Sequence, residues 1–126
     1  MTHTPYPESY YAASANPVPA RPELQGDVEV DVCIIGAGYT GLSTAISLLE
    51  NGFKVAIVEA AKVGFGASGR NGGQIVNSYS RDIDVIERTV APKPAQLMGQ
   101  MAFEGGRIIR ARIAKYNTNR HLKPRP

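Results

Sequence analysis

The chain has 126 residues, a formal net charge of +3 and a single cysteine. This length suffices for one modest domain but not for a two-domain dinucleotide enzyme, and so small a charge gives no support for nucleic-acid or membrane-surface binding. One cysteine excludes a disulfide framework, no apolar run approaches the ~20 residues of a spanning helix, and the polar N-terminus lacks a signal-peptide core, so a cytoplasmic location is expected.

Residues 1–27 are predicted to form an extended arm that precedes the folded part of the chain. Five prolines stand among the first 25 residues, and proline cannot supply the backbone hydrogen bonds of a helix or of a central strand. The aromatic rings of Tyr6, Tyr10 and Tyr11 could anchor this arm by burying their apolar faces on the surface of the domain.

Residues 28–59 have the pattern of a dinucleotide-binding βαβ unit. A short apolar run at 32–35 predicts a strand, and three glycines, Gly36, Gly38 and Gly41, follow it. A segment with apolar residues at helical spacing comes next, followed by Gly52 and by a second apolar run that ends at Glu59. This order of strand, glycine turn, helix, strand and acid predicts an α/β fold built on a Rossmann-like unit.

Each glycine of the turn has a physical task in such a unit. Gly36 permits a tight turn out of the strand, Gly38 permits close approach of a diphosphate, and Gly41 permits the helix to pack against the strand. The helix N-terminus, with Tyr39 and Thr40 in its first turn, then presents amides and a partial positive charge to the phosphates. The alternative is a purely structural glycine turn in another α/β protein.

The helix and the second strand are predicted to be buried against each other. The apolar positions of the helix are Leu42, Ala45, Ile46, Leu48 and Leu49. Gly52 fits the left-handed residue that ends many helices, and the apolar run at 53–58 predicts a strand buried on both faces, as in a parallel sheet. Cys33 is predicted to be a small buried residue of the first strand, not a nucleophile or a metal ligand.

Glu59 completes the pattern at the carboxyl end of the second strand. It stands 18 residues after Gly41, near the usual spacing of about 20. A carboxylate at this position accepts hydrogen bonds from ribose hydroxyls and repels a ribose 2′-phosphate. A phosphorylated dinucleotide is therefore disfavoured at this site.

Residues 60–73, here named the glycine-rich loop, contain five glycines and follow the second strand. A loop at the carboxyl end of a parallel sheet lies where open α/β folds bind ligands, so ligand contact is favoured over a mobile surface loop. Ser68 could hydrogen-bond a diphosphate. Arg70 could equally pair with a phosphate or remain solvated.

Two helices are predicted beyond the loop. Residues 74–80 are ambiguous between strand and helix, residues 82–89 predict a short helix, Pro92 and Pro94 interrupt it, and residues 95–116 predict a longer helix. The methionines of this second helix are predicted to lie in a core and its basic residues to be solvated. Gly105 and Gly106 weaken the helix, so a close helix contact is expected there. Residues 117–126 predict an irregular tail.

Four segments carry a resemblance to a known family: SYYAASAN at 9–16, DVCIIGAGYTGLS at 31–43, EAAKVGFGASGRNGGQIVNSYSRDIDVIE at 59–87 and MAFEGGRIIRARI at 101–113. They resemble the FAD-dependent amine oxidoreductases of the D-amino-acid oxidase superfamily, most of all the branch that acts in putrescine breakdown. The sequence GFGASGRNGGQ is the specific part. Family members are roughly three times as long. The ending after about residue 117 departs from the family and predicts a truncated or frameshifted reading frame.

The resemblance implies FAD as the cofactor, not NAD. The glycine turn would hold the diphosphate and Glu59 the adenosine ribose. Gly66, Ala67, Ser68 and Arg70 would cradle the diphosphate and adenosine side, and residues 71–74 would run beside the flavin ring. The residues implied to bind the cofactor are Gly36, Gly38, Tyr39, Thr40, Gly41, Glu59, Ala60, Gly66, Ala67, Ser68, Arg70, Asn71, Gly72, Gly73 and Gln74.

The resemblance also implies an activity for the complete enzyme. A small-molecule amine would be oxidised through an imine to an aldehyde, with release of ammonia and hydrogen peroxide. No metal, nucleic acid or membrane is expected as a partner, and His3 and His121, in the terminal tails, are poor catalytic candidates. The alternatives are another D-amino-acid, glycine or sarcosine oxidase-like flavoenzyme, a non-catalytic nucleotide-binding module, and a non-functional fragment.

Overall fold

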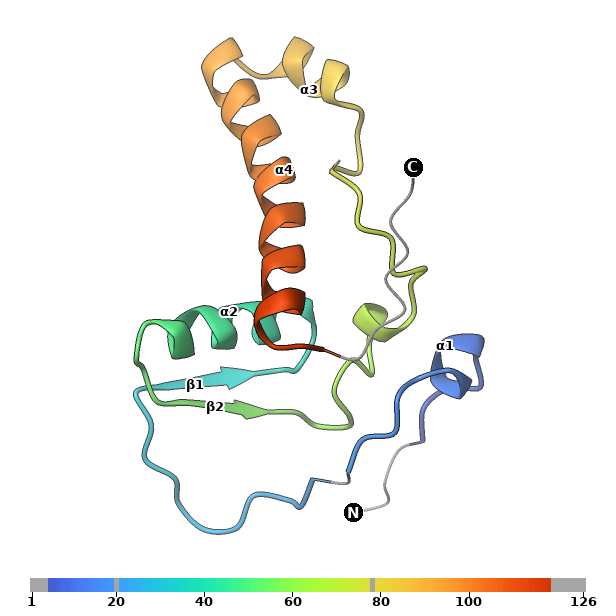
Figure 1. Ribbon diagram of the computed structural model, residues 1–126, viewed down its shortest axis with the longest axis vertical. Helices are drawn as coiled ribbons and strands as arrows, with labels where there is room; N and C mark the ends of the chain where they lie inside the picture. The colour runs from blue at the N-terminus through green and yellow to red at the C-terminus, as the bar shows by residue number, and fades with distance from the viewer. Residues whose placement is uncertain (1–4, 20, 78, 119–126) are drawn as a thin grey trace. The chain divides into compact units, whose positions relative to one another are not determined.

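This computed structural model describes residues 5–19, 21–77 and 79–118, and the chain divides into two compact units, Met1–Gly72 and Gly73–Pro126. The first unit holds the helices α1 (Tyr10–Ala13) and α2 (Tyr39–Glu50), the strands β1 (Val32–Ile35) and β2 (Val55–Val58), and a 3-10 helix η1 (Ala67–Gly69). The second unit holds α3 (Ile83–Thr89) and α4 (Pro92–Lys115) (Figure 1).

The first unit contains the predicted βαβ arrangement. Strands β1 and β2 pair in parallel, with Val32 opposite Val55 and Ile35 opposite Val58. The chain leaves β1 through the glycine turn, forms α2 and returns as β2, so the two strands run side by side and both end at the same edge of the sheet (Figure 1). This arrangement confirms the predicted α/β, Rossmann-like unit.

Helix α2 packs on one face of the two-stranded sheet. Ala45 is 3% exposed, because a small side chain lets the helix axis approach the strands closely. Gly52 adopts a φ of +85° just after the helix, as predicted, and its N–H donates to the carbonyl of Leu49 at 3.1 Å. The side chain of Leu49 is exposed, so the buried face of the helix does not include all of the apolar positions predicted from the sequence.

The other face of the sheet is exposed, which corrects two predictions. Side chains alternate along β1, so Ile34 is directed toward α2 whereas Cys33 and Ile35 are directed away from it. Cys33 is exposed, not buried, and Ile35 is 89% exposed, because no described element of the first unit covers this face. Strand β2 is half-buried along its length and not buried on both faces.

The arm contains a short helix that the proline count did not predict. Residues 8–16 contain no proline, and α1 forms within them with Ser9 at its N-cap, where Ser9 Oγ accepts from the N–H of Ala12 at 3.2 Å. Of the three proposed anchors, Tyr6 is half-buried, whereas Tyr10 and Tyr11 are exposed. Only Tyr6 therefore has the burial expected of an anchor.

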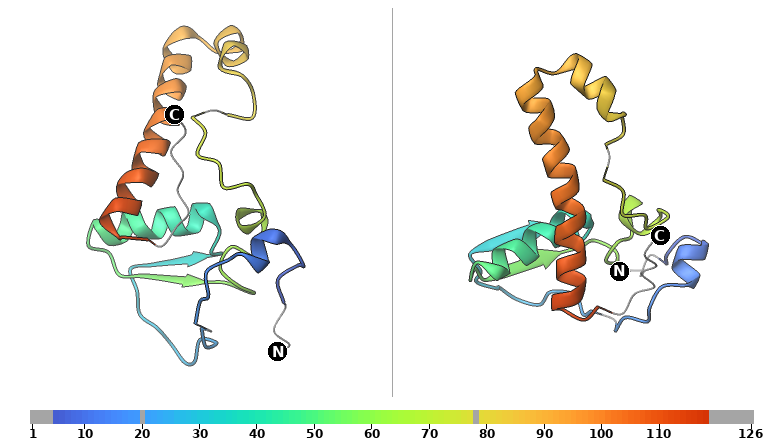
Figure 2. Two further views of the ribbon diagram at one scale, coloured as in Figure 1. Left: turned by 45° about the vertical axis from the view of Figure 1, so that its right-hand side comes forward. Right: turned by 45° about the horizontal axis from the view of Figure 1, so that its top comes forward.

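The second unit contains both predicted helices. Asp82 forms the N-cap of α3, while α4 begins at Pro92, three residues before the predicted start, because proline fits the first turn, where its missing N–H has no intrahelical role. The two helices contact each other (Figure 2). The side chains of Ile86 on α3 and of Ala95 on α4 are buried. The described residues of the ambiguous segment 74–80 form neither a strand nor a helix.

The paired glycines of α4 have different environments. A Cβ on Gly106 would lie 2.5 Å from Oδ1 of Asn77, so the predicted close contact exists but is made by a loop and not by a helix. A Cβ on Gly105 would meet nothing within 4 Å. Met101 is exposed, so its predicted place in a core is wrong. His3, His121 and the tail from residue 119 onward lie outside the described residues.

Candidate functional site

In the glycine turn that joins β1 to α2, Gly36 and Gly38 have two different backbone conformations. Gly36 has a φ of +99°, a left-handed value that favours glycine, and its N–H donates to the carbonyl of Val58 at 2.7 Å. Gly38 then forms the N-cap of α2 with extended backbone. The turn therefore begins while the chain is still hydrogen-bonded to β2 and ends where the helix begins.

Gly41 allows α2 to start directly above the turn. A Cβ on Gly41 would collide with the carbonyl oxygen of Gly36 and would lie 3.3 Å from Cγ2 of Ile34. Gly41 therefore has the close packing that was predicted for it. Its nearest obstacle is the backbone of the turn rather than a strand side chain.

Glu59 closes the turn from the end of β2. Its Oε2 accepts from the N–H of Ala37 at 2.8 Å, and its Oε1 accepts from the N–H of Ala61 at 3.0 Å. The hydrogen bond from Ala37, followed by that from Ala61, lowers the pKa of the Glu59 carboxyl below its ordinary value. The carboxylate predicted to meet a ribose is therefore ionised and held against the turn.

Replacing Glu59 by glutamine tests this bond through its dependence on acid. A lowered folded-state pKa stabilises the folded chain above the unfolded pKa, and that contribution is lost as the pH falls through the folded pKa. We expect Glu59→Gln to be less stable than wild type at neutral pH, with the difference shrinking as the pH falls below the ordinary pKa of a glutamate, about 4.3. Urea unfolding at a series of pH values measures it, and Glu29→Gln, outside the turn, is the control. A difference independent of pH would contradict the role of the charge.

The N-terminus of α2 lies against Ser68 of the glycine-rich loop. Ser68 Oγ accepts from the N–H of Tyr39 at 3.0 Å, and a Cβ on Gly38 would lie 2.9 Å from that oxygen. Among the described residues no acceptor is shown for the amides of Thr40 and Gly41. A glycine cradle, two donor amides and a hydroxyl thus meet at one helix end, which is an arrangement that fits a diphosphate.

The glycine-rich loop folds back on itself around η1. Arg70 Nε donates to the carbonyl of Gly66 at 3.3 Å, and Arg70 Cζ lies 5.7 Å from the centroid of the Phe65 ring. Asn71 Nδ2 donates to the carbonyls of Ala67 at 3.2 Å and Ser68 at 3.0 Å. The structure therefore directs Arg70 to its own loop, where its guanidinium adjoins an aromatic ring.

A second contact joins the loop to α2. The Tyr39 hydroxyl and the Asn71 side-chain amide are hydrogen-bonded, with Asn71 Nδ2 3.0 Å from the Tyr39 oxygen. Together with the Ser68 bond, this contact ties the first turn of α2 to the loop from its backbone and from its side chain. Tyr39 therefore connects α2 to the loop through both its backbone and its side chain.

The structure brings most of the predicted residues together in the first unit. The turn, Glu59 and the loop residues from Gly66 to Asn71 are linked by the bonds described above. The backbone N–H of Ala60 is a further, weaker hydrogen-bond donor to the Glu59 carboxylate. Gly72 is the last residue of that unit and is exposed. Gly73, with a φ of +65°, and Gln74 belong to the second unit, not to the unit that contains the turn.

Sequence reasoning missed the residues that connect these parts through their backbone. Ala37 is 2% exposed; its N–H donates to Glu59, and its carbonyl accepts from the N–H of Gly64 at 3.0 Å. Its position between two glycines of the turn is the only signal in the sequence that could have found it. Backbone groups carry no residue-type pattern, so Ala61 and Gly64 left no such signal.

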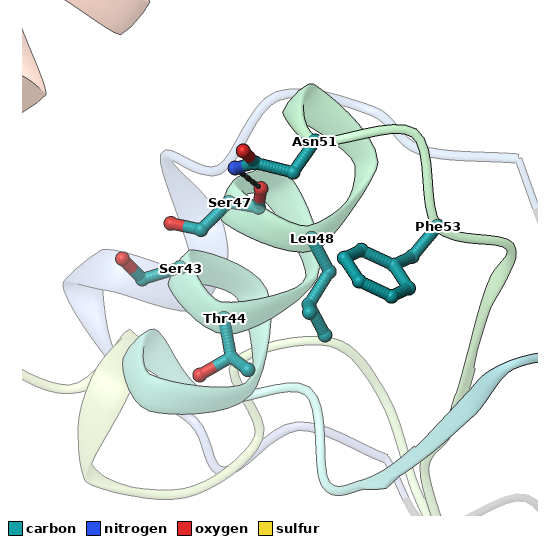
Figure 3. Close-up of a pocket in the computed structure, with 6 residues that line it drawn as sticks. All are labelled: Ser43, Thr44, Ser47, Leu48, Asn51 and Phe53. Carbon is teal, nitrogen blue, oxygen red and sulfur yellow. Dashed lines mark hydrogen bonds between the residues drawn. The ribbon is translucent and has the colours of Figure 1, made fainter.

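A shallow hollow on the outer side of α2 does not coincide with this site. It is lined by Ser43, Thr44, Ser47, Leu48, Asn51 and Phe53 (Figure 3). Asn51 Nδ2 donates within it to the carbonyl of Ser47 at 2.8 Å. No residue predicted to bind a cofactor lines the hollow, and its polar groups are those of an exposed helix face.

The described ranges contain neither a metal-binding cluster nor a membrane-spanning helix. Within residues 5–19, 21–77 and 79–118, no group of three or more His, Cys, Asp or Glu side chains could hold a metal ion. None of the helices in the same ranges combines the length and the apolar run that crossing a bilayer demands.

Comparison with known proteins gives a family match over most of the chain. The family described as DAO, FAD dependent oxidoreductase, matches residues 31–125. Gamma-glutamylputrescine oxidoreductase of Escherichia coli is 54% identical over 121 residues, which are 96% of this chain and 28% of that protein. The chain therefore spans little more than a quarter of the length of this relative.

Other relatives are similar over shorter stretches. The probable oxidoreductase OrdL of Haemophilus influenzae is 45% identical over 86% of this chain and 25% of its own length. D-amino acid dehydrogenase 2 of Pseudomonas aeruginosa is 44% identical over 54% of this chain and 15% of its own length. No solved structure matches the chain significantly.

Proposed function

Because this chain belongs to the FAD dependent oxidoreductase family, we propose that it forms the FAD-binding N-terminal segment of a flavin-dependent amine oxidase. The observation that carries the proposal is the meeting of the Gly38 cradle, the amides of Thr40 and Gly41, and the Ser68 hydroxyl at the N-terminus of α2. Backbone amides at a helix end bind phosphate without a cationic side chain.

The proposal gives each part of the site a task in holding FAD. The glycine turn and Ser68 would bind the diphosphate, and Glu59 would exchange its bond from Ala37 for hydrogen bonds from the adenosine ribose. Because the low pKa of Glu59 keeps it charged, the same group would exclude a ribose 2′-phosphate. The other residues assigned to the cofactor, Ala60, Gly66, Ala67 and 70–74, would line its path.

The substrate we propose is gamma-glutamylputrescine, the compound in the name of the Escherichia coli relative. When bound, the flavin would accept the hydride removed from the carbon that bears the amine, which leaves a carbon–nitrogen double bond. With water to hydrolyse the resulting imine and molecular oxygen to reoxidise the flavin, the products would be an aldehyde, ammonia and hydrogen peroxide. We assign substrate recognition to the part of such an enzyme beyond the 28% that this chain spans.

A D-amino acid is the second candidate substrate. The similarity to D-amino acid dehydrogenase 2 supports it, but over 54% of the chain rather than 96%. A complete enzyme that carries this segment distinguishes the two candidates by anaerobic bleaching of its flavin absorbance, which reports substrate oxidation whatever the final electron acceptor. We expect bleaching with gamma-glutamylputrescine and none with D-alanine; the reverse result would favour the second candidate.

Flavin uptake by the purified chain tests the binding step by itself. We expect the chain to retain the absorbance bands of oxidised flavin after desalting from excess FAD. ADP-ribose should displace the flavin at least about ten-fold more effectively than its 2′-phosphorylated form, because Glu59 repels the added phosphate. A colourless chain after desalting, with no change in FAD fluorescence on titration, would refute the proposed cofactor site.

A further inference from the structure

Tyr6 connects the arm to the glycine-rich loop across 57 residues of sequence. Its hydroxyl donates to the carbonyl of Val63 at 2.6 Å, and its ring stacks on Phe65 with centroids 6.1 Å apart and planes 26° from parallel. Lys62 Nζ lies 4.9 Å from the centroid of the Tyr6 ring. One arm residue thus contacts three loop residues through a hydrogen bond, a ring stack and a cation–π contact.

The contacts of Tyr6 fall on both sides of Gly64. Gly64 has a φ of +73°, and its N–H donates to the carbonyl of Ala37 at 3.0 Å. The backbone of Gly69 in η1 packs on the other end of Gly64, because a Cβ on Gly69 would collide with the Gly64 carbonyl oxygen. Gly64 is therefore the point where the loop, η1 and the glycine turn meet.

The path from Tyr6 to the site is short and continuous. Fixing Val63 and Phe65 fixes the Gly64 amide that bonds to Ala37, and Ala37 in turn donates to Glu59. Figures 1 and 2 show the arm, with α1, lying beside this loop. A glycine-rich loop loses much backbone entropy when it is ordered, so a contact from outside the loop stabilises its binding conformation.

We infer that Tyr6 is a positioning residue, through which the N-terminal arm braces the glycine-rich loop in the conformation that accepts FAD. The expected effect on FAD affinity rests on the proposed function. The brace itself rests only on the contacts of Tyr6. Tyr6 has no assigned contact with the cofactor. Its effect on FAD binding passes through Gly64 and Ala37.

Three variants separate the brace from its alternatives. Tyr6→Ala removes the stack and the hydrogen bond, Tyr6→Phe removes only the hydrogen bond, and Tyr10→Ala removes an exposed ring of the same arm as the control. The first measurement is amide hydrogen exchange of residues 62–71 without FAD. The second is the FAD dissociation constant.

We expect graded effects. Tyr6→Ala should speed exchange at the Gly64 amide and weaken FAD binding by about ten-fold, Tyr6→Phe should weaken it by about three-fold, and Tyr10→Ala should match wild type. Exchange in β1 and β2 should stay unchanged in all three, which shows that the unit remains folded. Global destabilisation would speed exchange in β1 and β2 as well as in the loop. An FAD affinity of Tyr6→Phe between those of wild type and Tyr6→Ala, with unchanged exchange in the strands, therefore indicates a local effect of the brace.

A double-mutant cycle with Phe65→Ala locates the coupling. If the stack transmits the effect, Tyr6→Ala should weaken FAD binding by only about three-fold once the Phe65 ring is gone, because the hydrogen bond to Val63 is still lost. Loop exchange in Tyr6→Ala equal to that of wild type would overturn the brace. Faster loop exchange in a chain whose wild type does not bind FAD would support the brace and refute the proposed cofactor site.

Discussion

Gly38→Val is expected to abolish FAD binding while β1, α2 and β2 remain folded. The Cβ would lie 2.9 Å from Ser68 Oγ, and the two methyl groups of valine would extend beyond it. They would displace the hydroxyl that accepts from Tyr39 and would occupy the space beside the helix N-terminus where the diphosphate is proposed to lie. Flavin absorbance after desalting measures the loss, which we expect to exceed about 100-fold in affinity.

Ser68→Ala is the matched variant for this experiment. It removes the same hydroxyl but adds no atom to the turn, so we expect FAD to bind about ten-fold more weakly rather than not at all. Equal losses in the two variants would assign the effect to the lost hydroxyl and not to the filled space. Wild-type flavin retention by Gly38→Val would show that the diphosphate is held elsewhere.

Gly41→Ala is expected to destabilise the first unit by about 3 kcal/mol. The added methyl group would meet the carbonyl oxygen of Gly36, and a backbone atom cannot turn aside as a side chain can. The whole turn would have to shift, which would also disturb the Gly36 bond to Val58. Urea unfolding followed by circular dichroism measures the loss, and hydrogen exchange in β1 and β2 assigns it to this unit.

Gly105→Ala provides the contrast, since the same methyl group enters a site with nothing within 4 Å. Alanine also has the higher helix propensity, so this variant should be more stable than wild type by about 1 kcal/mol. Opposite signs for the two substitutions would confirm that the local space, not glycine itself, sets the outcome. A Gly41→Ala chain as stable as wild type would show that the turn is softer than its packing indicates.

The parts of the fold that are determined by residues close together in the sequence could be predicted from it. The strand at 32–35, the left-handed Gly52 and the two later helices all follow from short-range patterns of apolar residues, glycine and proline. The early start of α4 was missed because proline breaks a helix interior but is accommodated in its first turn. Family membership was also predictable, because the glycine-rich loop carries it in a few specific residues.

Burial was harder to predict, because it depends on what covers each face. A short apolar run such as 32–35 is typical of a strand covered on both sides, yet Cys33 and Ile35 are exposed in the described unit. The same limit applies to the site. The acid at the end of β2 was predictable, but its bond to Ala37 and the contact of Tyr6 with Val63 each join a side chain to a backbone group far away in the sequence.

The exposed side of β1 has a consequence for the behaviour of the chain in solution. Contact between two molecules at this side would remove the exposed surface of Ile35 from water, and this hydrophobic driving force strengthens on warming. Concentrated samples should therefore scatter more light at room temperature than on ice. Because the Cys33 thiol lies on the same side, oxidation by air would convert such reversible encounters into covalent dimers, and a reductant would keep them separable.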